Sequence, residues 1–225
     1  MMTVKSLFVG ILFFLISISL SAQSIAIKGG LNFSKTEFST KIISPVEGEA
    51  NMRSKYRTGL NLGITNTLPV NKLLSLETGL IYQERGFITE LSYEELGAPY
   101  SEETKAHIIY LDVPFTLKAN FDLGNFEAYA FGGGYLGIGL GGQGESTSVF
   151  GGVTETLSGD VEFGEDGHFN RLDYGALFGV GLEFNSVFIE ASYGLGLSNI
   201  IVDSFGDETV KNRLISVSAG YRFNY

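Results

Sequence analysis

Two histidines, His107 and His168, carry the side chains best suited to proton transfer in this 225-residue sequence. A hydrolase would also need a nucleophile and an orienting group within hydrogen-bond reach of the histidine. Ser101 and Ser146 stand in nearby polar stretches, yet no spacing selects either serine as a nucleophile. We therefore expect no catalytic residue, and keep a hydrolase acting at these histidines as the alternative to a binding role.

Three further patterns resemble ligand sites, and each has a plainer explanation. Residues 139–144 read GLGGQG and fit G-x-G-x-x-G, but dinucleotide binding needs a helix next, and residues 146–152 offer none. Two distant histidines fall short of a usual zinc ligand set. Acidic residues crowd two stretches without the spacing of a calcium-binding loop: Glu90, Glu94, Glu95, Glu102, Glu103, Glu155, Asp160, Glu162, Glu165 and Asp166. We expect no cofactor and no metal site, and weak divalent-cation binding by these stretches stays open.

The chain begins like an exported protein. Lys5 precedes an apolar run over residues 7–20, and small residues follow it, which is the order of a secretory signal peptide. Because the run is shorter than the roughly 20 residues of a spanning helix, we predict a signal peptide over residues 1–22 and one domain over residues 23–225. The absence of cysteine excludes disulfides, and the net charge of −10 argues against a nucleic-acid partner.

Composition and periodicity predict strands for the rest of the chain. Thirty glycines are too many for long helices, and no apolar run after residue 22 approaches the length of a spanning helix. Polar and apolar side chains alternate with period two in about eight segments: 24–35, 55–67, 74–91, 105–120, 126–142, 169–184, 187–200 and 211–225. Short turns follow every second segment, and long polar loops follow the others at 36–54, 92–104, 143–168 and 201–210. This order predicts an all-β fold, an eight-stranded antiparallel transmembrane β-barrel built as an up-and-down meander.

The two faces of each segment favour the membrane barrel over a soluble β-barrel or sandwich, which stays the alternative. In a soluble sheet the charges point outward, whereas here the apolar faces are almost uninterrupted and the charges share faces with glycine and serine. If those faces line the lumen, they bring together five cations and six carboxylates: Lys28, Arg57, Glu77, Arg85, Asp112, Lys118, Glu127, Asp173, Glu183, Glu190 and Arg222. Because a buried charge is stable only beside a partner, this near balance predicts a plugged lumen and no diffusion pore.

Four stretches of the chain together match a known family pattern: GGLNFS at 29–34, YLDVPF at 110–115, GVGLE at 179–183 and GYRFNY at 220–225. Through them the chain resembles, over roughly residues 24–225, the PorT-like family of small outer-membrane β-barrels from Gram-negative bacteria. The resemblance implies a fold and a location but no reaction. The last of these stretches is similar to the terminal signal read by the barrel-assembly machinery, with Gly220, Phe223 and Tyr225 as its marks.

These observations together predict a multi-pass barrel in the outer membrane, not an enzyme, with tight turns and both termini in the periplasm. The segments 74–91 and 126–142 exceed the ~9–11 residues that a spanning strand needs, so we expect them to project beyond the bilayer. The long loops would bind an extracellular partner, with lipopolysaccharide and a periplasmic protein as further candidates. A hydrolase acting on lipid or peptide at the barrel rim is the alternative, and the charged lumen argues against a narrow channel.

Overall fold

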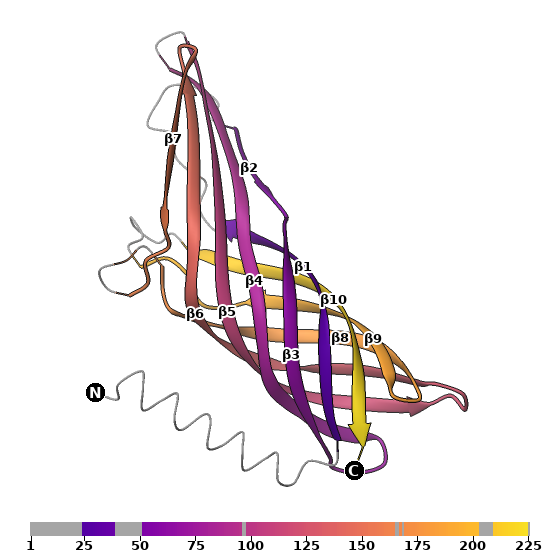
Figure 1. Ribbon diagram of the computed structural model, residues 1–225. Coiled ribbons are helices and arrows are strands. Elements are labelled where there is room, and N and C mark those ends of the chain that lie inside the picture. Colours follow the sequence, from indigo (N-terminus) through magenta and orange to yellow (C-terminus); the bar gives the residue numbers. More distant parts are fainter. Residues whose placement is uncertain are drawn as a thin grey trace.

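The computed structural model describes residues 24–38, 51–95, 98–164, 167, 169–202 and 209–224. Ten strands form within these residues: β1 (Ser24–Phe38), β2 (Asn51–Lys55), β3 (Arg57–Pro69), β4 (Leu74–Glu95), β5 (Ala98–Asp122), β6 (Glu127–Phe150), β7 (Val153–Asp160), β8 (Leu172–Phe184), β9 (Val187–Gly196) and β10 (Val210–Asn224). Eight of them close a ring in the order β1-β3-β4-β5-β6-β8-β9-β10, and β10 pairs back with β1 (Figure 1). The predicted eight-stranded antiparallel barrel is confirmed. The predicted signal peptide lies outside the described residues, and within them no helix is long and apolar enough to span a membrane.

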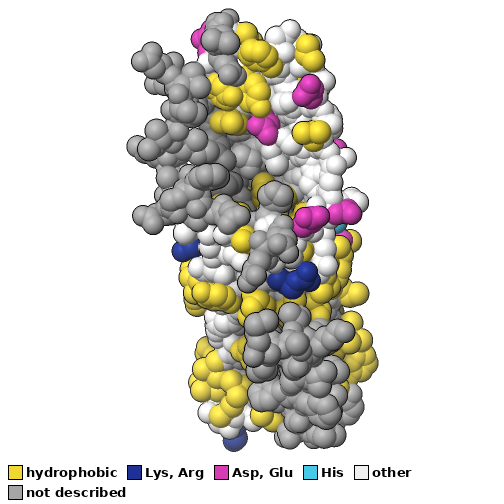
Figure 2. Space-filling view, turned by 90° about the vertical axis from the view of Figure 1, so that its left-hand side faces the viewer, with side chains coloured by type: hydrophobic (Ala, Val, Ile, Leu, Met, Phe, Trp, Pro, Cys, Tyr) yellow, Lys and Arg dark blue, Asp and Glu magenta, His cyan; other side chains and the backbone are white. Residues whose placement is uncertain are grey.

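Burial alternates along the barrel strands with the polarity reversed from that of a soluble protein. In β8, Asp173 and Glu183 are buried while Val180 is 60% exposed, and β1, β3, β9 and β10 repeat the pattern. The exposed side chains form an apolar belt around the barrel, which includes Ile27, Leu31, Leu60, Leu62, Ile64, Leu76, Phe115, Leu117, Phe178, Val180, Leu182, Ile189, Tyr193, Ile215, Val217, Tyr221 and Phe223. Hydrophobic side chains cover much of the lower half of the face in Figure 2. An apolar belt on the outside is the pattern of a membrane-spanning barrel, whose exterior faces hydrocarbon. The closed ring also leaves no unpaired strand edge in the membrane.

Tight turns join the strands at one end of the barrel, which we call the turn end. The two-residue turn between β8 and β9 places Asn185 at φ 57°, a left-handed conformation that asparagine tolerates. In the turn between β5 and β6, the Gly124 amide donates a 2.8 Å hydrogen bond to the Asp122 carboxylate. The last strand, β10, also finishes at this end (Figure 1). We call the opposite end of the barrel the hairpin end.

A five-stranded sheet rises from the hairpin end, in the order β2-β4-β5-β6-β7 (Figure 1). The ring strands within it are long, with 22 residues in β4, 25 in β5 and 24 in β6, so the projection expected for segments 74–91 and 126–142 is present. Our prediction of polar loops at 92–104 and 143–168 is wrong in large part. β4 extends to Glu95 and β5 begins at Ala98, while β6 extends to Phe150 and β7 covers Val153–Asp160. Both faces of this sheet carry Ser, Thr and Glu, so no apolar alternation marks these strands in the sequence. Of the expected loops 36–54 and 201–210, residues 39–50 and 203–208 lie outside the described residues.

An irregularity in β6 marks the point where the projecting sheet leaves the barrel. Ile109 of β5 faces Gly141, whereas the next residue, Tyr110, faces Gly139, so Leu140 is an extra residue in β6. A bulge of this kind bends the strand and increases its twist. The bulge therefore separates the ring part of β6 from the projecting part.

Candidate functional site

Six charged side chains meet in the half of the lumen nearer the turn end, and we call them the six-charge cluster: Lys28, Glu77, Lys118, Glu183, Glu190 and Arg222. All six are buried. The Lys28 ammonium donates a 2.6 Å hydrogen bond to Glu190, and the Arg222 guanidinium lies 2.9 Å from Glu183. Glu77 is shared, because its carboxylate oxygens lie 3.9–4.0 Å from the cationic nitrogens of Lys28, Lys118 and Arg222. Three cations therefore face three carboxylates, and the cluster is neutral as a unit.

The aromatic and hydroxyl groups around this cluster complete its hydrogen bonds. The Tyr129 hydroxyl donates to Glu190 at 3.2 Å, and the Lys118 ammonium lies 3.4 Å from the centroid of the Tyr129 ring. The ring has room there because Gly181 has no side chain: a Cβ at that position would lie 2.3 Å from the ring carbon Cζ. Glycine in these inner faces thus makes space for the long charged and aromatic side chains of neighbouring strands.

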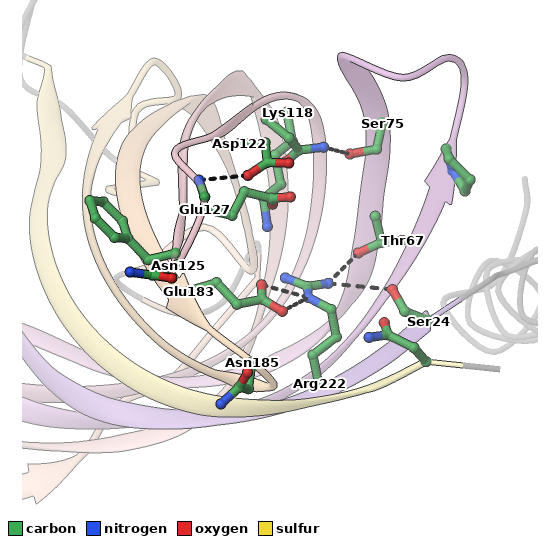
Figure 3. Close-up of a pocket in the computed structure, with 15 residues that line it drawn as sticks. Ser24, Thr67, Ser75, Lys118, Asp122, Asn125, Glu127, Glu183, Asn185 and Arg222 are labelled. Carbon is green, nitrogen blue, oxygen red and sulfur yellow. Dashed lines mark hydrogen bonds and ion pairs between the residues drawn. The ribbon is translucent and has the colours of Figure 1, made fainter.

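A polar vestibule of about 540 Å³ opens below the cluster at the turn end (Figure 3). Arg222 points into it from β10 and donates to the Thr67 hydroxyl at 2.8 Å as well as to Glu183. Glu127, which we predicted as part of the lumen charge network, lies on the vestibule wall directly opposite Glu183 in the β6–β8 register and is half-buried. The vestibule therefore ends blindly on the six-charge cluster.

A second charge cluster lies nearer the hairpin end and is centred on Arg85. Its guanidinium is fully enclosed and contacts the carboxylates of Asp112 and Asp173, the latter at 2.7 Å. Asp173 also accepts hydrogen bonds from the Tyr135 hydroxyl, the Ser198 hydroxyl and the Asn212 amide, at 3.1, 2.5 and 2.9 Å. These donors supply the extra hydrogen bonds that let a second carboxylate share one arginine in a buried site.

An apolar plug closes the lumen above the Arg85 cluster, and the sequence did not lead us to expect it. Buried side chains of β5, namely Ala106, Ile108 and Tyr110, form its floor. Phe87 packs against them, together with Val161, Phe163 and Phe169 from the segment between β7 and β8. The one signal in the sequence was the pair of phenylalanines within an otherwise acidic segment. From the vestibule upward the lumen thus holds six charges, then the Arg85 cluster, then the plug.

Arg57, the remaining member of the predicted lumen network, belongs to a different place. It is half-buried and lines a groove of about 600 Å³ at the hairpin end with Lys105 and His107. A Cβ on Gly86 would lie 3.0 Å from Cδ of Arg57, so the arginine passes close over this glycine. The structure therefore places Arg57 at the rim, apart from both lumen clusters.

The rim supplies no catalytic constellation within the described residues. Burial, and next the charge of Arg57, lower the pKa of His107 from its ordinary value, while its Nε2 lies 3.9 Å from Glu84. The Ser146 hydroxyl donates to Glu102 at 2.7 Å, and its register partner is Thr104, whereas that of His107 is Gln143. No described hydrogen bond joins His107 to Ser101 or Ser146, and His168 lies outside the described residues.

The other patterns singled out in the sequence find structural places. Residues 139–144 run through β6 and are followed by more strand, so they lack the helix that a dinucleotide site requires. No group of three or more potential metal ligands is assembled among the described residues; Glu165 and Asp166 are not among them. In the proposed assembly signal, Phe223 is exposed and Gly220 pairs with Lys28 of β1, while Tyr225 lies outside the described residues.

The projecting sheet offers the largest exposed surface of strand backbone in the described chain. Every residue of β7 is exposed, with Leu157 at 74%, and among the described strands β7 pairs with β6 alone. The outer edge of β7 therefore carries backbone amides and carbonyls that no other described strand pairs. Near the tip, the ring centroids of Tyr93 and Tyr100 lie 4.7 Å apart, and Phe150 follows at 6.5 Å, which stiffens the sheet across three strands.

The chain was also compared with solved structures and with curated protein sequences. The chain is similar in structure to Ail, the attachment invasion locus protein of Yersinia pestis, with 19% identity, 90% of this chain and 99% of Ail covered, and a TM-score of 0.36. It is also similar to OprG from Pseudomonas aeruginosa (15% identity, 91% and 98% covered, TM-score 0.41) and to Neisserial surface protein A (14%, 89% and 97%, TM-score 0.38). Comparison with curated protein sequences gave no significant match.

A family model describes most of the chain. Residues 21–202 match the model of the outer membrane protein beta-barrel domain. The matched stretch includes both lumen clusters except Arg222 and Asn212, and the whole of the projecting sheet. The narrower resemblance to PorT-like proteins stays a prediction. The chain belongs to the outer membrane protein beta-barrel domain family.

Proposed function

We propose that this protein is a closed outer-membrane barrel that holds a binding surface outside the cell and conducts no solute. The observation that carries the proposal is the projecting sheet, in which β7 is wholly exposed and has a free edge. A free edge of this kind binds an extended peptide by adding a strand, with backbone hydrogen bonds supplying affinity. The filled lumen supports the second half of the proposal, because two charge clusters and an apolar plug occupy it in series.

The hairpin end faces the outside of the cell in this proposal, and the turn end and both termini face the periplasm. Short periplasmic turns and longer external segments are the usual arrangement in bacterial barrels. Because the sequence has no cysteine, single-cysteine variants can test it with a membrane-impermeant maleimide on intact cells. Leu157→Cys should react at once, and Asn125→Cys in the β5–β6 turn only after permeabilisation. The reverse order of labelling would overturn the orientation.

The partner that best fits the β7 edge is an extended basic peptide segment. β7 has the sequence VTETLSGD, with Glu155 and Asp160 and no lysine or proline, which are the residues that usually block an edge. Glu145 of β6 adds another carboxylate beside β7, since its register partner is Ser158. A second copy of β7 would bring like charges together, so self-pairing is disfavoured.

Panning a displayed peptide library against the barrel in nanodiscs tests the binding role. We expect enrichment of alternating, basic peptides, and protection of the β7 amides from hydrogen exchange when an enriched peptide is added. Thr156→Pro removes one edge amide and should abolish enrichment, whereas Thr156→Val keeps the backbone and should not. A barrel trimmed of residues 144–159 serves as the reference, and equal enrichment on it would refute the role. Steady conductance in planar bilayers would refute the closed lumen.

A further inference from the structure

The two borders of the apolar belt differ in charge. At the turn end the outward side chains finish on apolar residues such as Phe121, Phe184 and Phe223, and among the described residues Lys72 is the one cation that is not directed into the lumen there. At the hairpin end, cations follow the last apolar positions on several strands: Lys35 on β1, Lys211 and Arg213 on β10, Lys105 on β5, and Arg171 before β8. In Figure 2 basic side chains border the top of the lower hydrophobic band, with one more at its bottom end. The protein therefore offers positive charge to the headgroups at the hairpin end and little to those at the turn end.

Two cations near this border each have a carboxylate partner of their own, whereas the cations on β1 and β10 share one. Lys55 pairs with Glu90, and Lys105 with Glu103 at 2.6 Å. By contrast, Lys35 and Arg213 are direct register partners, two like charges placed opposite each other. Such a pair is unfavourable unless an anion offsets it.

Lys211 lies two residues from Arg213 on the same outward face, and Glu37 is its register partner. Glu37 makes its ion pair with Arg213, so among the described residues of this patch three cations share one carboxylate. We call Lys35, Lys211 and Arg213 the cation triad. The positive charge that the described carboxylates leave unpaired lies next to the outward positions of Phe33 and Ile215 on the same strands.

Arg213 and Lys35 are also held by contacts that carry no negative charge, so the surplus charge of the two lysines stays available. The Arg213 guanidinium donates 3.0 Å hydrogen bonds to the carbonyls of Gly196 and Asn212, which anchor it against β9 and β10. The Lys35 ammonium lies 5.1 Å from the centroid of the Tyr56 ring, which orients it over the barrel exterior. Carbonyl and ring contacts neutralise no formal charge. An anion arriving from the membrane side would therefore find preorganised donors.

From this geometry we infer that the cation triad binds the phosphate groups of a diphosphorylated glycolipid such as lipid A in the leaflet at the hairpin end. Acyl chains would pack along Leu31, Phe33, Ile215 and Val217, which are outward-facing neighbours on β1 and β10. The phosphates would then sit at the depth of the triad, where basic residues beside a membrane surface attract anionic headgroups. Three cations suit two phosphates better than the single phosphate of a phospholipid. This site is independent of the β7 edge, but it rests on the proposed orientation, in which the hairpin end faces the outside of the cell.

Native mass spectrometry of the full barrel in phosphatidylcholine nanodiscs, with added diphosphoryl lipid A, tests the site. The double variant Lys35→Gln and Lys211→Gln leaves the Arg213–Glu37 pair intact and should lower the affinity about 30-fold, since each lysine near a membrane surface contributes about fivefold in affinity. Lys72→Gln at the turn end is the matched control and should leave the affinity within about twofold, because it lies beyond the screening length. Dephosphorylated lipid A should bind poorly because it lacks the phosphate charges, and inorganic phosphate should bind poorly because it lacks acyl chains.

Three results would overturn the inference. Unchanged affinity in the double variant would remove the triad from the site. Equal losses in the double variant and in Lys72→Gln would reduce the effect to overall charge. Phosphatidylglycerol or dephosphorylated lipid A binding as tightly as diphosphoryl lipid A would refute the assignment of the ligand. Normal peptide enrichment at β7 in the double variant would separate a failure here from a failure of the proposed function.

Discussion

Replacing Glu77 by glutamine should destabilise the barrel more than any other single carboxylate change in the six-charge cluster. Glu77 is the carboxylate that contacts all three cations, Lys28, Lys118 and Arg222, at 3.9–4.0 Å. At an effective dielectric constant of ~20, each such contact is worth about 4 kcal/mol of gross attraction. The desolvation of Glu77, which glutamine avoids, offsets much of this sum. Removing one partner from a buried ionic group costs about 3–5 kcal/mol net, and we expect Glu77→Gln to fall in that range.

A second substitution distinguishes charge imbalance from a packing defect. Lys118 has Glu77 as its one carboxylate partner within 4 Å, so Lys118→Met added to Glu77→Gln returns the cluster to neutrality. The double variant should therefore lose less than the sum of the single losses, by at least about 1 kcal/mol. Glu127→Gln makes the same chemical change on the vestibule wall and should stay within about 0.5 kcal/mol of the parent.

The assay is urea unfolding of the barrel in short-chain phosphatidylcholine vesicles, followed by far-ultraviolet circular dichroism because the chain has no tryptophan. A cost below about 1 kcal/mol for Glu77→Gln would refute the reasoning, since it lies under the range for buried ionic partners. Strict additivity of the two substitutions would refute it as well, because contacting residues in one charge cluster should couple.

Three other outcomes follow from the described contacts. Gly30→Ala should cost about 1–3 kcal/mol in the same unfolding assay, because its Cβ would lie 2.0 Å from the Val217 carbonyl oxygen, whereas Gly144→Ala, with open space around it, should cost almost nothing. By nuclear magnetic resonance, the pKa of His107 should lie below its ordinary 6.5, fall further in Glu84→Gln and rise in Arg57→Gln. Burial favours the neutral form of His107 in the folded state. Its contribution to the free energy of unfolding should therefore be complete above pH 6.5 and decline as the pH falls through the lowered pKa. If the difference in unfolding free energy between wild type and His107→Gln did not change with pH, this prediction would be wrong. Trimming residues 144–159 should leave the urea midpoint of the barrel unchanged, since the removed residues pair with one another and with the projecting part of β5. A lower midpoint would show that the projection supports the ring.

The sequence predicted the ring of the barrel well because each ring strand has one face against hydrocarbon. β8 and β9, for example, begin and end within a few residues of the predicted segments 169–184 and 187–200. The projecting strands were predicted as loops because water lies on both sides of them and no apolar period exists there. Thr154 and Thr156 in β7 were the available hint, since threonine favours strands, but their propensity is too weak to outweigh the polar composition.

The site was less predictable than the fold because contacts depend on register and curvature. Alternation puts Lys28 and Glu190 on inner faces, but their 2.6 Å contact depends on the way the closed ring brings β1 and β9 together. Arg57 also has inner parity in its segment, yet it lies at the rim, where Gly86 leaves it a path and Glu84 offers a counter-charge. The plug was missed because Phe163 and Phe169 are separated by glycine and acidic residues that look like an ordinary loop.

The central claim is that hydrocarbon covers the outside of the barrel while ionic groups fill its inside. Spin labels at Val180→Cys and Ile189→Cys, both more than half exposed on the apolar belt, test it most directly through their collision rates with oxygen and with a water-soluble nickel chelate. The account predicts that oxygen, which dissolves in lipid, relaxes both labels far more than nickel does, and that Leu157→Cys on β7 shows the opposite preference. Labels at Val180 and Ile189 that respond mainly to nickel would contradict it.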